Sequence, residues 1–466
     1  MTTALVVLAY AGVPPSVRFP ASVAMIAWTA WILTTSRLAS NPLVPFFGMW
    51  LISFSVRFGG MIEFADDSGQ AVPMAFLMVF LALVLLGYAL APDTPSLRRR
   101  APVPPGYATP LSTLAQDLFR FRHLLDLAAL AGYVAAISFA TEMITYNHVN
   151  VMDPSSTREV FQVERVVTPL TYLTLLARSG GIIAFITGII GWQWLSKTKT
   201  AVYIGSGLSI VVLSIVTAGR FIVLEVLMAG LFAIAAKRTL GLPVFRGKRY
   251  AYAAVGSVVV VVLYIFAISI YRSDFSPDRN EQYMLATMHG DVSRELKDTW
   301  FSAMPVEARS SLISAYANIG GPVQNFAVFW KVHSAPLSWG SLQFSIVSRN
   351  LKRVFPSVVS ADEVLEMSAA EFKAVGEGGA SWQTGVRDII VDFGQVGAVW
   401  GALLLGATIA FLNARFCDEA SLATILPLCG IWIVCFHFTM YSIIGEPAVV
   451  ALLACGLLPR SSGGRS

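Results

Sequence analysis

At Ser381-Trp-Gln-Thr-Gly-Val-Arg387-Asp388-Ile-Ile-Val-Asp392-Phe-Gly-Gln-Val-Gly397, a long polar segment of the chain meets an apolar run. The polar segment begins near Arg272 and ends near Gly385, and apolar runs of membrane length surround it. A helix needs about 20 mostly apolar residues to cross a bilayer. This junction therefore predicts a polytopic membrane protein that carries one large loop on one face.

The composition agrees with a membrane protein. The chain is 56% hydrophobic and 13% charged, whereas soluble domains have about 25% charged residues. Its net charge of +5 comes from basic residues grouped in short loops, which is the pattern of cytoplasmic loops between membrane helices. We therefore expect no nucleic-acid partner. The four cysteines lie in or beside apolar runs of the last fifth, so no disulfide framework is indicated.

The apolar runs predict an all-α fold of about 11–12 transmembrane helices. The candidate spans are 20–36, 43–59, 72–91, 124–142, 179–195, 201–217, 221–236, 250–271, 387–413, 420–437 and 441–458. Residues 4–13 could add a short twelfth. The organisation is then an N-terminal transmembrane bundle (1–271), a large loop (272–385) and C-terminal helices with a tail (386–466).

Three basic connections set the orientation. The segments 93–123, 196–200 and 237–249 all become cytoplasmic in one alternation. The loop 272–385 then lies outside, on the periplasmic face of an inner membrane. Several prolines, Pro322 among them, are expected to divide this loop into short helices, with amphipathic ones at 291–297 and 361–373.

Arginines gather at the predicted outer face. They are Arg178, Arg220, Arg272 and Arg387. Each could reach along the membrane surface by snorkelling, but four on one face favour an anion site. A guanidinium group binds phosphate through two hydrogen bonds and stays charged at any relevant pH. The anion expected at this face is the diphosphate of a lipid carrier.

Acidic, imidazole and aromatic groups near this face are the other candidates for chemistry. Asp388 and Asp392 are four residues apart and share one face of a helix's beginning. They could complement the helix dipole, act as a base or bind sugar hydroxyls. His333 is a second candidate base, because imidazole is the side chain most often used in general acid–base catalysis. Aromatic rings able to stack on sugars are those of Tyr316, Trp339 and Trp382. These rings could equally pack the loop against the bundle.

Several catalytic motifs do not occur. The chain has no GxxxxGK[ST], HExxH or GxSxG sequence, so ATP-driven, zinc-protease and hydrolase-elbow chemistry lack support. Acidic pairs of the DxD type are missing from the outer loops. We therefore expect catalysis without a metal or other cofactor.

The ordered motifs resemble those of a known family. Tyr316-Ala-Asn-Ile-Gly-Gly-Pro322, then Trp339-Gly-Ser-Leu-Gln-Phe344, then Thr384-Gly-Val-Arg387-Asp388 leading to Gly397 are similar to the large outer loop of bacterial oligosaccharide repeat-unit polymerases (Wzy, O-antigen polymerase type). Ala218-Gly-Arg220 in a tight outer turn also fits. The match departs at Ser381-Trp-Gln-Thr384, where an Asn-Val-Tyr-Thr-like run would be expected.

The resemblance implies an enzyme that transfers a polyprenyl-diphosphate-linked glycan, with inversion, onto a lipid-linked repeat unit. Its fold would be related to the lipid-dependent glycosyltransferases and O-antigen ligases. Its partners would be lipid-linked oligosaccharides, membrane lipids and a chain-length regulator protein. Two alternatives stay open, namely a ligase-like transferase with another acceptor, and a transporter or flippase of lipid-linked saccharides. The long outer loop and the lack of an inverted repeat disfavour the transporter.

Overall fold

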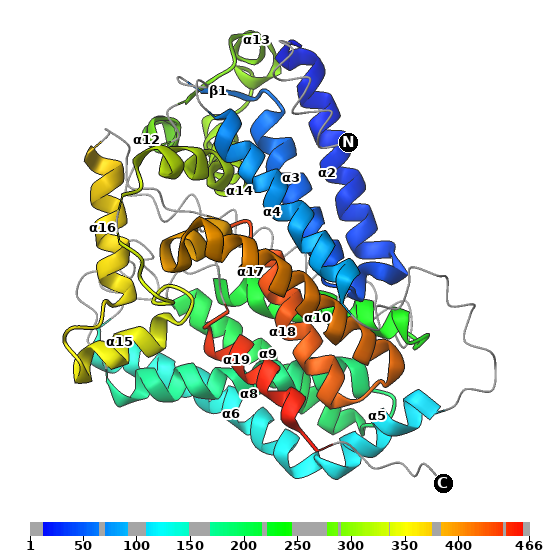
Figure 1. Ribbon diagram of the computed structural model, residues 1–466. Coiled ribbons are helices and arrows are strands. Elements are labelled where there is room, and N and C mark those ends of the chain that lie inside the picture. The colour runs from blue at the N-terminus through cyan, green and yellow to red at the C-terminus, as the bar shows by residue number, and fades with distance from the viewer. Residues whose placement is uncertain are drawn as a thin grey trace.

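The fold is all-α, as expected. The computed structural model describes residues 13–64, 70–91, 109–148, 168–216, 221–244, 277–287, 290–334, 336–374, 384–440 and 444–459. Helices make up 81% and strands 2% of the structure (Figure 1). The bundle consists of α2 (Pro15–Thr35), η1 (Arg37–Ser40), α3 (Leu43–Phe58), α4 (Ala71–Leu90), α5 (Thr109–Arg120), α6 (Arg122–Thr141), η2 (Glu142–Tyr146), α8 (Pro169–Gly191), α9 (Lys197–Val216), α10 (Phe221–Thr239), α17 (Gly385–Asp418), α18 (Leu422–His437), α19 (Pro447–Ala454) and η5 (Cys455–Leu457).

Among the residues that the structure describes, four helices are long and apolar enough to cross a membrane. They are α4, α6 with its continuation η2, α8 and α17. Three shorter apolar helices, α3, α18 and α19 with η5, accompany them. The length and composition of these helices are consistent with a membrane protein. The larger number of spans stays a prediction, and the expected span 250–271 lies outside the described residues.

Local capping explains where the site-bearing membrane helices begin. Thr168 caps α8, with Pro169 at the first helical position, and Thr384 caps α17 by accepting the N–H of Arg387. A side-chain oxygen at this position satisfies an N–H group that has no partner within the helix. The cap at Thr168 starts α8 ten residues before the expected span 179–195, so that boundary was wrong. Arg178 consequently lies inside the helix, about 13 Å along it at 1.5 Å per residue.

The basic connections lie at one end of the bundle. The amide N–H of Leu422 donates to Asp117, Arg120 donates to the carbonyl of Pro459, and Ser40 bonds Thr239. These contacts bring together the loops that the charge pattern assigns to the cytoplasmic side. Figure 1 shows the elements of the large loop away from α5, with α12, α13 and α14 at the top and α16 and α15 along the left. Which of the two ends faces outward stays a prediction.

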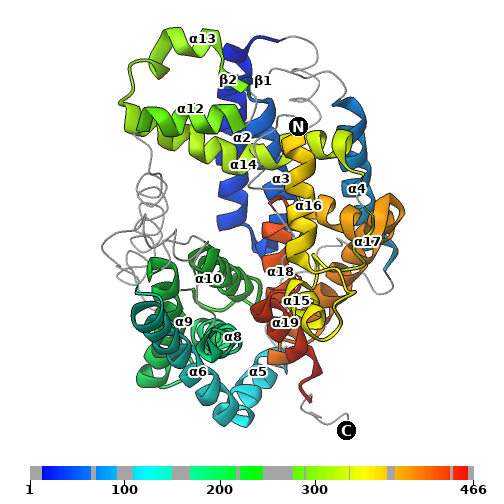
Figure 2. The ribbon, with the colours of Figure 1, turned by 90° about the vertical axis from the view of Figure 1, so that its left-hand side faces the viewer.

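Two groups of helices make up the molecule. Figure 2 shows α5, α6, α8, α9 and α10 below, and α2, α3, α4, α12 and α14 above, with α16 to α19 along one side. Close approaches rely on glycine. A side chain at Gly406 of α17 would collide with the carbonyl of Val84 in α4, and one at Gly132 of α6 would collide with Gly181 of α8. Small residues at such contacts let membrane helices pack closely.

The large loop is built differently from the expectation. Its elements are α12 (Pro277–Thr287), β2 (Gly290–Val292), α13 (Arg294–Leu296), η4 (Lys297–Phe301), α14 (Val306–Val332), α15 (Ser345–Val354) and α16 (Ala361–Ala374), and β2 pairs with β1 (Ile62–Phe64). The helix expected at 361–373 is confirmed. The one expected at 291–297 is confirmed only in part, because β2 takes residues 290–292 and the helical turns begin at Arg294.

One proline of the loop does not end a helix as expected, whereas Pro277 and Pro305 stand where α12 and α14 begin. Pro322 lies within α14, a single helix of 27 residues, although an interior proline removes a hydrogen bond and crowds the preceding turn. Packing offsets this cost, because Gly320 lies against Val56 and the amide of Arg57 in α3, and Gln324 accepts a hydrogen bond from Arg57. The tertiary contact with α3 therefore overrides the local preference.

Candidate functional site

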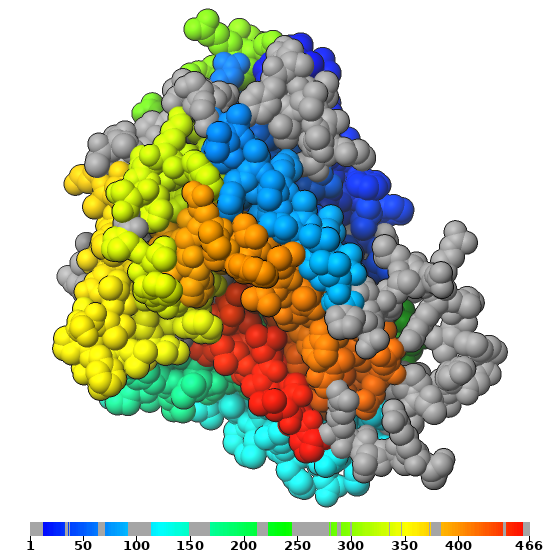
Figure 3. Space-filling view, viewed as in Figure 1, coloured from blue at the N-terminus to red at the C-terminus, as the bar shows by residue number. Residues whose placement is uncertain are grey.

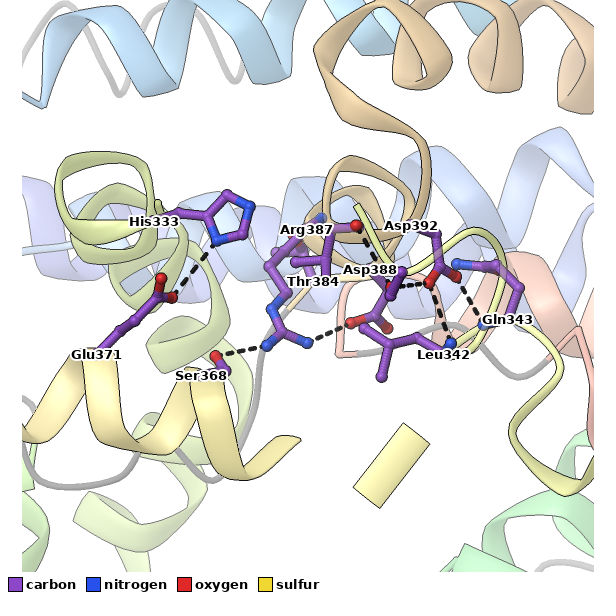
Figure 4. A network of polar contacts seen from close by, with 11 residues as sticks. His333, Leu342, Gln343, Ser368, Glu371, Thr384, Arg387, Asp388 and Asp392 are labelled. Carbon is purple, nitrogen blue, oxygen red and sulfur yellow. Dashed lines mark hydrogen bonds and ion pairs between the residues drawn. The ribbon is translucent and has the colours of Figure 1, made fainter. Parts of the chain in front are cut away.

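Three helices from separate parts of the chain meet at one place. The end of α14, the middle of α16 and the beginning of α17 converge there, as Figure 4 shows. They bring His333, Arg387 and Asp388, the three predicted catalytic residues, into one polar cluster. The ring of Phe329 lies at its centre, next to both His333 and Arg387.

Arg387 is the most deeply buried charge of the cluster. Its side chain is 1% exposed. Nη1 donates to Oδ1 of Asp388 at 2.9 Å, and Nη2 donates to Oγ of Ser368 at 2.6 Å. The guanidinium carbon lies 5.7 Å from the ring centre of Phe329, within the range of cation–π attraction. Nε is buried without a hydrogen-bond partner among the described residues. One N–H donor of this desolvated guanidinium group is therefore unsatisfied.

His333 and Glu371 form a second pair. Nδ1 of His333 lies 3.4 Å from Oε2 of Glu371, and the imidazole packs on Phe329 with ring centres 4.5 Å apart. Glu371 also accepts the backbone N–H of Ser334 at 2.9 Å, which fixes the carboxylate. When Nδ1 carries the proton it donates to Glu371, and Nε2 is then the basic nitrogen. A nearby carboxylate of this kind orients the imidazole of a general base.

Asp392 has a different role from the one predicted. Its side chain is fully buried, and its oxygens accept the hydroxyl of Ser338 and the backbone N–H groups of Leu342 (3.1 Å) and Gln343 (2.9 Å). Both carboxylate oxygens are thus occupied by the segment that precedes α15. Asp392 holds this segment against α17, and its oxygens are engaged within the protein rather than turned to a sugar.

A break in α17 accompanies this contact. Gly394 has φ 74° and ψ 179°, which only glycine adopts readily, so α17 divides into a short first arm and a long second arm. Near the break, the carbonyls of Val391 and Asp392 accept the N–H groups of Ser338 (3.1 Å) and Trp339 (3.0 Å). The loop before α15 thus satisfies the backbone carbonyls next to the break. The break also sets the direction of the first arm, so that Arg387 and Asp388 lie in the cluster.

The predicted diphosphate-binding arginines are not brought together in the part that the structure describes. Arg178 is 7% exposed and pairs with Glu446 at 2.7 Å and with Glu225 at 3.6 Å. Two carboxylates surround this single guanidinium group, so Arg178 is not a free anion site here. Arg220 and Arg272 lie outside the described residues, as does Trp382.

The two described aromatic candidates differ in exposure. Tyr316 is buried, and its hydroxyl donates to the carbonyl of Arg57 at 3.4 Å. Its ring packs the loop against the bundle, which was the alternative to sugar stacking. Trp339 is 78% exposed and has φ 51°, so its ring is accessible.

Sequence reasoning missed residues that the structure adds to the cluster. Ser368 and Glu371 are three residues apart on α16 and therefore share a helix face, which the amphipathic pattern at 361–373 could have indicated. Phe329 carries no such signal, because it is one of many apolar residues in α14. A separate buried network, Arg57 with Gln70 and Gln324, was also missed, and it lies beside the expected motif at Tyr316–Pro322.

Comparison of the chain with protein-family models, curated proteins and solved structures gave no match. The resemblance to repeat-unit polymerases therefore stays a prediction. Any functional assignment depends on the geometry of the cluster and on the membrane character of the chain.

Proposed function

We propose that the protein polymerises polyprenyl-diphosphate-linked oligosaccharide repeat units at the outer face of the cytoplasmic membrane, as a Wzy-type glycosyltransferase. An acceptor sugar hydroxyl attacks the anomeric carbon of the donor glycan. The new C–O bond forms as the bond to the diphosphate breaks, the configuration inverts, and polyprenyl diphosphate leaves with the bonding electrons. The hydroxyl proton passes to a base on the protein.

The observation that carries the proposal is the convergence of a buried arginine and a histidine–carboxylate pair on Phe329. In this reaction negative charge grows on the leaving diphosphate while a proton leaves the acceptor. The buried Arg387 supplies a preoriented positive charge, and losing such a donor typically costs about 3–4 kcal/mol in the transition state. His333, oriented by Glu371, accepts the proton.

Asp388 is better suited to positioning than to proton transfer. Its Oδ1 accepts a hydrogen bond from Nη1 of Arg387 at 2.9 Å, so this oxygen already holds the guanidinium group in place. We assign Asp388 the task of holding Arg387 and of accepting a hydrogen bond from a sugar hydroxyl. We therefore propose His333, rather than Asp388, as the base.

The site's position suits a lipid-borne substrate. It lies where a membrane-length helix, α17, begins, at the end of the bundle away from the basic connections. Two substrates anchored in the same leaflet would meet there by lateral diffusion. Because the site would hold both in a fixed orientation, their reaction would become effectively unimolecular.

A complementation experiment in the source cell tests the proposal. The gene is deleted and then restored as wild type, His333→Ala or Glu366→Gln, a change on the exposed side of α16. Wild type and Glu366→Gln are expected to restore long surface polysaccharide, whereas His333→Ala gives single repeat units only. Single units still reaching their final acceptor distinguish a polymerase from a ligase, because loss of a ligase removes both products. Full-length polymer in the deletion strain contradicts the proposal.

A second experiment tests the chemistry directly. The purified protein in lipid nanodiscs is incubated with lipid-linked repeat units extracted from the deletion strain. A ladder of lipid-linked polymer is expected, with release of polyprenyl diphosphate and without loss of activity in EDTA. Inhibition by EDTA that added divalent cation reverses would contradict the expected metal-independent reaction.

A further inference from the structure

An exposed apolar surface surrounds α15. We call it the α15 surface and define it by large apolar side chains that are 42–78% exposed, namely Trp339, Phe344, Val347, Leu351, Val354 and Phe355. Contiguous apolar patches on a protein surface mark contact with another protein or with a membrane. This surface belongs to the large loop and lies outside the spans expected from the sequence.

The helix that carries the surface is amphipathic. Val347, Leu351 and Val354 follow the spacing i, i+4, i+7 and lie on one face of α15. Basic side chains point elsewhere. Arg349 pairs with Asp362 at 2.8 Å and Lys352 with Glu363 at 2.9 Å. These ion pairs tie the polar side of α15 to α16 and leave its apolar side uncovered.

The neighbour of this surface is the end of a membrane helix. Arg353 donates to the hydroxyl of Tyr172, in the first turn of α8, and its guanidinium carbon lies 5.8 Å from the tyrosine ring centre. Leu173, next to Tyr172, and Leu176, one turn further along α8, are 44% and 71% exposed, as side chains facing lipid would be. Figure 3 shows the yellow loop segment beside the blue-green helices of the bundle.

We propose that α15 lies in the plane of the membrane, at the boundary between headgroups and acyl chains, with phospholipid acyl chains covering the α15 surface. A helix of 10 residues is too short to span a bilayer, but an amphipathic helix can lie in the interface with its apolar face among the acyl chains. The exposed Trp339 fits this depth, because tryptophan concentrates at the membrane–water boundary.

Lipid is favoured over a protein partner because the surface continues onto α8. A protein covering α15 would also have to cover the lipid-facing end of a membrane helix. The proposal has a consequence for the site. The segment between Trp339 and α15 is held to α17 by Asp392, so anchoring α15 in the interface fixes the first arm of α17 relative to the headgroups. This inference does not depend on the proposed function.

Spin labels attached to single cysteines test the proposal in nanodiscs of phosphatidylethanolamine and phosphatidylglycerol. The four native cysteines are first replaced. Labels at Val347→Cys and Val354→Cys report on the α15 surface, a label at Leu176→Cys is the lipid reference, and one at Glu366→Cys is the water reference. Collision with oxygen reports lipid exposure, and collision with a water-soluble nickel complex reports water exposure.

Both α15 labels are expected to behave as the label at Leu176 does, with high oxygen and low nickel accessibility. Nickel accessibility equal to that at Glu366 would overturn the proposal, because the surface would then face water. Low accessibility to both reagents would also overturn it, because protein would then cover the surface. Spectral broadening between labels on two molecules would identify that protein as a second copy of the chain.

Discussion

Asp392 accepts the backbone N–H of Gln343 at 2.9 Å, although 49 residues separate the two in the chain. This contact joins the segment before α15 to the first arm of α17, four residues after Asp388. The segment before α15 and the arm of α17 that bears the polar cluster are therefore joined directly by hydrogen bonds. A carboxylate that the sequence suggests as a ligand for sugars instead holds the loop in place.

Replacing Asp392 is expected to lower stability before it affects chemistry. Asp392→Ala leaves the N–H of Gln343 buried without an acceptor, and each such unsatisfied group costs about 1–3 kcal/mol. Thermal unfolding of the purified protein in detergent measures the loss. Asp362→Ala, which removes an exposed ion pair, is the control and is expected to change little. Equal stability of Asp392→Ala and the wild type would return Asp392 to the candidate ligands.

Arg387→Lys is expected to abolish polymer while the protein stays at its normal level in the membrane. The guanidinium group reaches Asp388 and Ser368 through two different nitrogens, and a lysine ammonium on a flexible stem does not reproduce this planar fork. Polymer length on gels and protein level by immunoblot measure the two effects. Arg349→Lys, on the surface of α15, is the matched control. Wild-type polymer from Arg387→Lys would remove Arg387 from the proposed machinery.

Glu371→Gln is expected to reduce the rate of polymer formation by about 10- to 100-fold, because the amide no longer fixes the imidazole of His333 as a charged acceptor would. General acid–base catalysis contributes about 10²–10⁴-fold, so a positioning residue accounts for a part of this. Initial rates in nanodiscs measure it. Glu366→Gln on the same helix should retain wild-type activity. If both variants behave alike, the histidine–glutamate pair has no part in the reaction.

The predicted orientation can be checked by cysteine labelling in intact cells. Ser357→Cys, in the exposed turn between α15 and α16, should react with a membrane-impermeant maleimide. Thr198→Cys, in the exposed first turn of α9, should react only after the membrane is permeabilised. Both changes are made in a background without the four native cysteines. The reverse pattern would place the polar cluster on the cytoplasmic face and contradict the proposed function.

Ser360 and Glu363 cap the beginning of α16, since the backbone N–H of Ser360 donates to the Glu363 carboxylate at 2.9 Å, and this cap should weaken in acid. The backbone N–H of Ser360 and the ammonium of Lys352 lower the pKa of the Glu363 carboxyl. A lowered pKa means that the contact stabilises the folded protein above the group's ordinary value of 4.5 and is lost as the pH falls through the lowered value. Hydrogen exchange in the first turn of α16 should be faster in Glu363→Gln than in wild type at neutral pH. The two rates should converge in acid, and a constant ratio down to pH 3 would contradict the assignment.

The sequence by itself determined the all-α class, the membrane character and the helix at 361–373. These follow from local composition and periodicity, which decide whether a segment can satisfy its backbone in a helix and bury an apolar face. Arg387 and Asp388 could likewise be selected from the sequence, because a charge beside a membrane-length run is costly and uncommon. His333 could be selected because imidazole is the most frequent general base.

Only the tertiary structure decided what each candidate contacts. Arg178 pairs with two carboxylates and Tyr316 packs against α3, whereas their residue types alone suggested ligand binding. Helix α14 continues through Pro322 because packing on α3 offsets the local cost, and Glu371 joins the cluster because α16 folds back onto α14. Such contacts join segments far apart in the chain, and no local pattern encodes which buried donor will meet which acceptor.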